Sequence, residues 1–195
     1  IRFKPFNNVR KVKSIALRNP KDIAISENKA LIQGDYAVVL VNKRGEQELS
    51  NDNFNECQIE MYYTPTEHFI LNCPDNALHF LSSDNLSESF IISQYDAIQK
   101  TISIKNNIVF YSGGNLFCYN IQKSIDPIWK AAFNSVESII PFENNIVVLE
   151  ASGRLSLLSI NTGDTIAVLR SDADRIHPLA KGTLGLFTNE GALIV

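Results

Sequence analysis

A pattern of turn-forming residues recurs along this chain about every 39 residues. Each repeat has a polar turn, then a tight turn rich in Gly, Asp or Asn, then a third turn about ten residues later. The tight turns are Gly34-Asp35, Asp75-Asn76, Gly113-Gly114-Asn115, Ser152-Gly153 and Glu190-Gly191. Short apolar or alternating runs between evenly spaced turns predict antiparallel strands. Four strands in a period near 40 residues are typical of one blade of a β-propeller.

The third and fourth repeats, residues 97–134 and 138–170, show the pattern most clearly. Their expected strands are 101–104, 108–111, 116–121 and 128–133 in the third, and 138–142, 146–149, 155–160 and 165–170 in the fourth. The first and second repeats, 22–50 and 58–93, match more loosely. The fifth begins at Arg175 and stops inside its third strand, at 191–195.

We therefore predict an all-β fold in which residues 1–195 form one β-propeller domain of four-stranded antiparallel blades, with very little helix. Two versions stay open. In a closed ring of five blades, Val9–Leu17 would supply the outer strand of the last repeat and so protect its open edge. In the other version, the chain is a fragment of a larger ring of about six to eight blades. An open β-solenoid is the third possibility.

Composition narrows the class of function. Hydrophobic residues make up 45% of the chain, which is typical of a globular protein. The net charge is −3 and the one basic cluster, Arg10–Lys13 with Arg18, is short, so no nucleic-acid partner is expected. No apolar run approaches the roughly 20 residues of a membrane-spanning helix. The chain begins at Ile1, so we expect a processed or excised piece, and membrane association through a partner or a missing anchor stays open.

The three cysteines are Cys57, Cys73 and Cys118, and none of their spacings resembles a CxxC motif. Cys118 lies in an apolar strand, where a buried free thiol is the usual state. A disulfide between two of the three is compatible with an oxidising compartment, but the sequence does not say which two pair.

Two segments resemble the repeats of the quinoprotein-like (PQQ/WD-like) propeller superfamily. They are Asn107–Phe133, with its Gly113-Gly114 turn and Trp129, and Asn145–Leu169, with its Asn161-Thr162-Gly163 turn. The chain is more similar to the non-catalytic, BamB-like type, because Trp occurs once and the acidic calcium and quinone ligands of the dehydrogenases have no counterpart. The resemblance implies no cofactor, a role in an assembly, and a periplasmic or outer-membrane-associated location in preference to a cytoplasmic one.

No converging catalytic, cofactor or metal site is predicted. The histidines His68, His79 and His177 share no metal-ligand spacing and are expected on different blades. Turn carboxylates such as Asp172, Asp174 and Glu190 are expected to be solvated, and the Ser112-Gly113-Gly114 and Ser152-Gly153 segments to be hairpin turns. Among the aromatic residues, Tyr62 and Trp129 are candidates for a rim that anchors a partner.

The leading functional hypothesis is a non-catalytic protein-binding scaffold, a subunit or domain of a larger assembly that offers loops or a sheet edge to a protein partner. The alternative is a ligand-sensing domain or a cofactor- or sugar-binding enzyme with a pocket in the central channel. The alternative predicts that acids and aromatic residues converge at the channel mouth.

Overall fold

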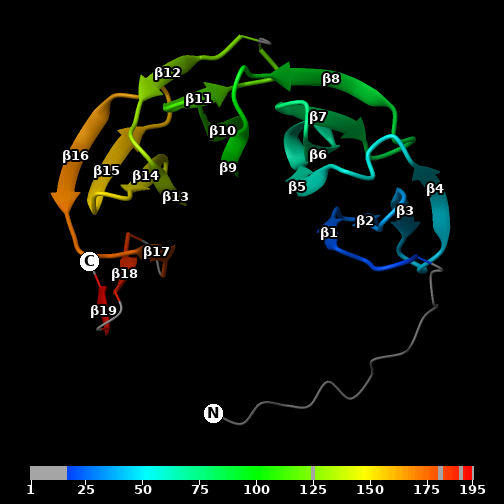
Figure 1. Cartoon of the computed structure of the whole chain (residues 1–195), viewed down its shortest axis with the longest axis horizontal. Helices are drawn as coiled ribbons and strands as arrows, with labels where there is room; N and C mark the ends of the chain where they lie inside the picture. Colours follow the sequence, from blue (N-terminus) through cyan, green and yellow to red (C-terminus); the bar gives the residue numbers. More distant parts are fainter. Residues whose placement is uncertain (1–16, 124–125, 180–181, 189–190, 195) are drawn as a thin grey trace. The chain divides into compact units, whose positions relative to one another are not determined.

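The computed structural model describes residues 17–123, 126–179, 182–188 and 191–194. Over these residues the fold is all-β, with nineteen strands in five antiparallel sheets (Figure 1). The one helical element in the described part is a 3-10 turn at Thr64–Thr66. No helix there is long and apolar enough to span a membrane.

Each sheet is one sequence repeat, and its strands follow the chain in order from one edge to the other. The first sheet comprises β1 (Asp22–Ile25), β2 (Lys29–Gln33), β3 (Val38–Asn42) and β4 (Gln47–Asn51). The second comprises β5 (Gln58–Tyr63), β6 (His68–Cys73), β7 (Ala77–Ser82) and β8 (Glu88–Ser93). The third comprises β9 (Ile98–Ile104), β10 (Asn107–Ser112), β11 (Asn115–Tyr119) and β12 (Trp129–Ala132). The fourth comprises β13 (Val136–Phe142), β14 (Asn145–Glu150), β15 (Arg154–Ser159) and β16 (Thr165–Arg170). The fifth comprises β17 (Arg175–Pro178), β18 (Leu184–Thr188) and β19 (Gly191–Ile194).

The predicted fold class is confirmed: the repeats are antiparallel blades of a β-propeller. Strand β16 has the expected bounds, and most other strands differ from expectation by one to three residues at an end. The backbone conformation of the tight turns follows from their residues. Gly113 and Gly114 have φ values of 53° and 77° between the paired residues Ser112 and Asn115, so the two-residue hairpin uses positive φ at both positions.

The described residues group into two compact units. One contains the residues up to Cys73 together with His79–Ile91, and the other contains Pro74–Leu78 with the residues from Ile92 onward. In the first unit β1 lies beside β5, and the core between the sheets is built from buried side chains such as Leu31, Leu40 and Phe69.

In the second unit β13 lies between β9 on one side and β17 on the other. One core forms between the third and fourth sheets and a second between the fourth and fifth. The second strand of the fourth sheet is apolar on both faces, because Ile146 and Val148 pack toward the third sheet and Val147 and Leu149 toward the fifth.

Some expectations lie outside what the structure describes. Residues 9–16 of the expected closing strand, the basic cluster Arg10–Lys13 and Glu190 are not among the described residues. The single-domain assignment and the number of blades in a complete ring stay predictions.

Candidate binding surface

The last residue of the second strand holds an inter-blade connection in four repeats. Ser112 Oγ donates to the Asp96 carbonyl at 2.7 Å, just before β9 begins. Glu150 Oε1 accepts from the Asn134 amide at 3.1 Å, just before β13. At the same position, Gln33 donates from Nε2 to the carbonyls of Asn55 and Cys57. These polar groups are structural anchors, because each satisfies main-chain groups that the strands leave unpaired.

Cys73 occupies this position in the second repeat and makes the connection covalent. It forms a disulfide with Cys57, which lies just before β5. Cys118 is free and buried. The structure therefore selects one of the three pairings that the sequence left open. Burial raises the pKa of the Cys118 thiol to about 12, so this thiol is protonated and unreactive at neutral pH.

The expectation that the three histidines occupy different blades is wrong, since His68 begins β6 and His79 lies in β7 of the same sheet. Each histidine nevertheless has its own surroundings. His68 Nε2 is 2.7 Å from Ser89 Oγ, and His79 Nδ1 bonds Glu88 while its ring packs edge-on against Phe54. The third, His177 of β17, is exposed and contacts the ring of Phe187.

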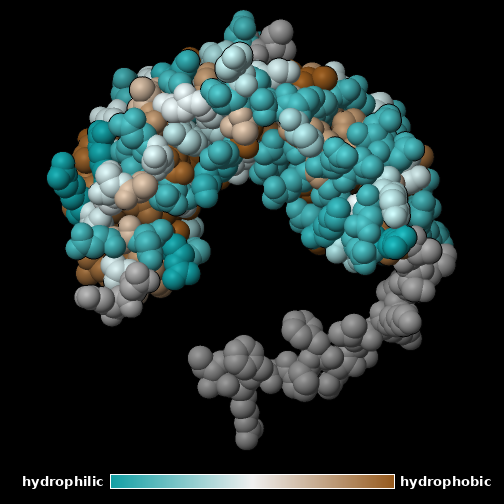
Figure 2. Space-filling view, viewed as in Figure 1, coloured by the Kyte–Doolittle hydropathy of each residue, from teal (hydrophilic) through white to brown (hydrophobic). Residues whose placement is uncertain are grey.

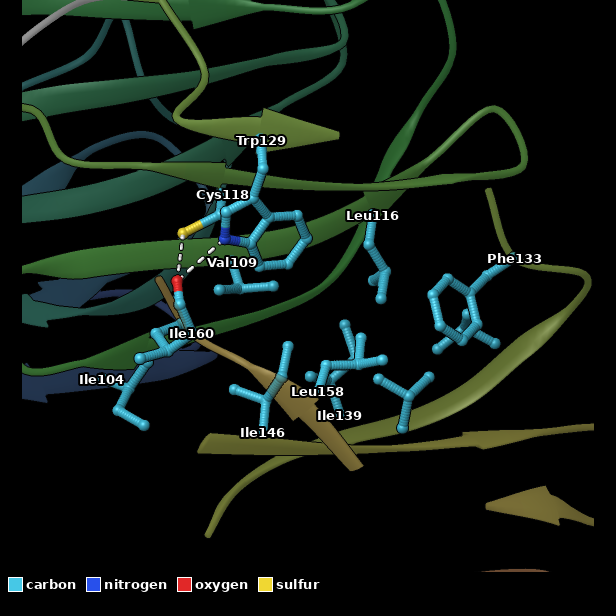
Figure 3. Packing of buried hydrophobic residues seen from close by; sticks show 12 residues of the cluster. Ile104, Val109, Leu116, Cys118, Trp129, Phe133, Ile139, Ile146, Leu158 and Ile160 are labelled. Atoms are coloured by element: carbon cyan, nitrogen blue, oxygen red, sulfur yellow. Dashed lines mark hydrogen bonds between the residues drawn. The ribbon is translucent and has the colours of Figure 1, made fainter. Parts of the chain in front are cut away.

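The rim role predicted for Trp129 is wrong. Its side chain is buried between the third and fourth sheets, and Nε1 donates to the Ile160 carbonyl at 2.8 Å (Figure 3). In the same view the Cys118 sulfur points at that carbonyl oxygen. The ring also explains the glycine of the Asn161-Thr162-Gly163 turn: a Cβ on Gly163 would lie 2.7 Å from Trp129 Cδ2. Sheet packing therefore fixes both residues.

Tyr62 is only half-buried, with its ring centroid 5.2 Å from that of Phe69. Burial is the main cause that raises its pKa. Among the described residues, the most exposed aromatic side chains were not singled out from the sequence: Tyr95 is 96% exposed, and Tyr36 is exposed beneath the Arg18 guanidinium. Their one sequence signal is their position next to the turn residues Asp96 and Asp35.

Two of the turn carboxylates do come together, which the sequence did not reveal. Asp172 and Asp174 line a polar pocket with Glu137 and the buried Glu150. Glu150 Oε2 has no hydrogen bond, and Arg154 Nε lies 3.6 Å from it. The Ser112 and Ser152 segments are hairpin turns, as expected.

A second pocket in the same unit is almost wholly apolar. Its volume is about 340 Å³, and it lies between the fourth sheet and the fifth sheet. The lining residues are Phe142, Val147, Leu155, Leu157, Ala167, Val168, Leu169, Leu184 and Leu186. Strand β16 forms one wall, and all six of its residues are exposed. Figure 2 shows hydrophobic residues at the surface in the region that carries β16 in Figure 1.

The exposure of β16 was not predictable from its composition. The run Ile166–Leu169 is four consecutive apolar residues, which is typical of a strand buried on both faces. In the structure Ile166, Val168 and Leu169 are each about half exposed, because β16 is the outer strand of its sheet. An apolar edge strand at the surface is the arrangement that proteins usually avoid unless something pairs with it.

No family model matches the chain, and no curated protein matches it. Solved structures do match. BamB from Moraxella catarrhalis aligns with a TM-score of 0.62 and 12% identity, over 85% of this chain and 56% of that one. A chain of the mitotic checkpoint complex aligns with a TM-score of 0.67 and 12% identity, over 89% and 60%. AztD from Citrobacter koseri aligns with a TM-score of 0.63 and 9% identity, over 79% and 47%.

The chain thus spans between 47% and 60% of the length of these three solved chains. At such low identity the likeness shows the β-propeller fold, while the quinoprotein-like superfamily within that fold stays a prediction.

Proposed function

We propose that this chain is a non-catalytic scaffold that binds other proteins, as a β-propeller subunit or domain of a larger assembly. The observation that carries the proposal is β16. Ile166, Val168 and Leu169 are 55%, 50% and 49% exposed on a strand whose outer edge faces no other strand of the described residues. Exposed apolar side chains together with unpaired main-chain groups favour a protein partner that adds a strand.

The solved relatives support this reading at the level of the fold. One of them is a chain of a multi-protein complex, the mitotic checkpoint complex. BamB, another of them, is the type to which the sequence repeats are similar.

A photo-crosslinking experiment tests the scaffold role. A photoreactive amino acid replaces Val168 on β16 or, as the control, Ser50 on β4, which is also exposed on an outer strand. In the cells that make the protein, we expect the Val168 site to capture one defined protein and the Ser50 site to capture none. The same background at both sites, together with turnover of a small substrate, would contradict the proposal.

We also propose that the protein works in an oxidising compartment, and a periplasmic or outer-membrane-associated location fits this best. The Cys57–Cys73 disulfide supports the proposal, because such bonds persist outside the reducing cytosol. Quenching the cells in acid and then alkylating the free thiols of the denatured protein tests it. We expect one modified cysteine, Cys118, whereas three would refute the location.

The alternative, a ligand-sensing propeller or a cofactor- or sugar-binding enzyme, stays a prediction that binding and turnover assays would test.

A further inference from the structure

Side chains that can bind a metal ion converge beside the Cys57–Cys73 disulfide. Among the residues that the structure describes, Cys73 and His79 belong to the one group of cysteine, histidine and acidic side chains that lies close enough together to hold a metal ion. The Cys73 sulfur and a ring nitrogen of His79 are within 4.8 Å of each other. Because Cys57 is bonded to Cys73, its sulfur lies beside them. Three donors of the types that Zn²⁺ prefers therefore meet at the second sheet.

The fold brings these donors together from three segments. Cys57 lies in the connection between β4 and β5, Cys73 ends β6 and His79 lies in β7. Cys57 and His79 are buried, and the His79 ring packs edge-on against Phe54 of the same connection. The turn from β6 to β7 carries Asp75, two residues after Cys73, and its carboxylate is the candidate fourth ligand. Two cysteines, a histidine and an aspartate supply the four ligands of a tetrahedral zinc site.

A carboxylate on β8 gives His79 the support that metal-bound histidines usually have. Glu88 Oε1 bonds Nδ1 of His79. Such a contact orients the imidazole ring and raises the basicity of the nitrogen that binds the metal. Glu88 is therefore a positioning residue for such a site and not one of its ligands.

The disulfide keeps the site closed, because the sulfur ligand of a metal ion is a thiolate. A dithiol reductant opens the site: two electrons and two protons pass to the Cys57 and Cys73 sulfurs, the bond between them breaks, and the reductant becomes a disulfide. Each thiol then loses its proton when a metal ion binds. The oxidised and the metal-bound forms both tie the connection before β5 to the end of β6, where Ser112 and Glu150 use hydrogen bonds in their own sheets.

We propose that the reduced thiols of Cys57 and Cys73, together with His79, form a redox-dependent site for one Zn²⁺ ion, which Asp75 completes. Zinc binds only when the two thiols are reduced. Sulfur and nitrogen ligands select Zn²⁺ over Ca²⁺ and Mg²⁺, which require oxygen ligands. The inference goes beyond the scaffold function and does not depend on it.

Titration with Co²⁺, a spectroscopic substitute for Zn²⁺, tests the proposal. The purified chain is reduced with a dithiol, desalted without air and titrated. We expect thiolate-to-cobalt charge-transfer absorption that saturates at one ion per chain and disappears when Zn²⁺ displaces Co²⁺. The oxidised chain should show no such absorption. Zn²⁺ should also raise the thermal midpoint of the reduced chain, because it binds the folded state.

Substitutions identify the ligands. Glu88→Gln should weaken Co²⁺ binding by the reduced chain roughly 10–100-fold and keep the charge-transfer band at saturation, because only the orienting carboxylate is lost. His79→Gln should weaken binding at least as much. His68→Gln is the matched control, since it removes an imidazole from β6 of the same sheet, and binding should stay within about twofold of the unchanged chain. Cys118→Ala should behave like this control. Circular dichroism of each oxidised variant checks that the fold is retained.

Equal Co²⁺ binding by the oxidised and the reduced chain overturns the redox dependence. Unchanged affinity in His79→Gln, or loss of binding in Cys118→Ala, overturns the choice of ligands. If reduction alone unfolds the chain, Zn²⁺ should restore the strand signal in circular dichroism, and failure to do so overturns the site. None of these results changes what the photo-crosslink from Val168 captures, so the scaffold proposal is tested separately.

Discussion

Glu150 buries a carboxylate at a position where the other repeats manage with an uncharged group. Ser112 holds the equivalent connection with a hydroxyl, and Gln33, at the same strand position, bonds the connection after its own sheet with an amide. Only one oxygen of Glu150 has a hydrogen bond, and the half-exposed Arg154 lies 3.6 Å from the other. Burying a charge with so little compensation costs free energy. The hydrogen bond to the Asn134 amide therefore stabilises the fold, whereas the negative charge of the carboxylate does not.

Replacement of Glu150 by Gln should therefore leave the free energy of unfolding unchanged or raise it by up to about 1 kcal/mol. Glu150→Ala should lower it by about 1–3 kcal/mol, because the Asn134 amide then loses its acceptor. Urea unfolding followed by circular dichroism measures both. A Gln variant as unstable as the Ala variant would show that the carboxylate charge itself stabilises the fold.

Burial of Cys118 makes the free energy of unfolding depend on pH in the alkaline range. Its pKa rises from 9.0 in the unfolded chain to about 12 in the fold because burial disfavours the thiolate. The folded state therefore holds a proton that the unfolded state releases. The contribution of the protonated Cys118 thiol to the free energy of unfolding is complete below pH 9 and disappears as the pH rises toward 12.

Substituting Cys118 by Ala should accordingly flatten the loss of stability above pH 9. Thermal midpoints of the two proteins from pH 7 to 11 measure the effect. Tyr62 and Tyr119, whose pKa values burial also raises, act in both proteins and cancel in the comparison. If the thermal midpoints of the two proteins fall in parallel as the pH rises, Cys118 is not the cause of the alkaline loss of stability.

The disulfide acts on an element, the hairpin of β5 and β6. It closes a loop with a sequence separation of 16 and ties the entry of β5 to the end of β6. Cross-linking restricts the unfolded chain, and a loop of this length is worth about 3 kcal/mol.

Reduction should thus lower the free energy of unfolding by about 3 kcal/mol, with a range of roughly 2–5. Urea unfolding with and without a reductant measures the change, and the Cys57→Ala/Cys73→Ala double variant controls for it by being insensitive to the reductant. A reductant effect of equal size in that variant would refute this origin.

Elements also show where sequence reasoning succeeds and where it stops. The turns at Gly113-Gly114 and Gly153 can be predicted from the sequence, because few residues other than glycine adopt positive φ easily. Turns at even spacing in turn predict the number and order of the strands. The residues that a side chain contacts in the fold cannot be predicted from the sequence in this way. Trp129 was expected at a rim, but packing against the fourth sheet buries it, and the pocket that Ala167 lines is formed by residues of two different sheets.

On the scale of the whole molecule, a repeat protein is held together by contacts between neighbouring blades, so damage should stay local. The cores support this view: one lies between the first and second sheets, and the core that contains Trp129 lies between the third and fourth. The two cores belong to different compact units.

Truncation of Trp129 to Ala tests that locality. It removes a buried indole and leaves the Ile160 carbonyl without its donor, at a cost of about 3–5 kcal/mol. Hydrogen exchange by mass spectrometry should show faster exchange across β9 to β16 and unchanged protection of β2 and β3, because the lost contacts belong to the second unit alone. Trp129→Phe, which keeps most of the packing, should show the same pattern with a smaller increase. Equal loss of protection in β2 and β3 would mean that the chain unfolds as one cooperative body, and stability would then be a property of the entire array of blades.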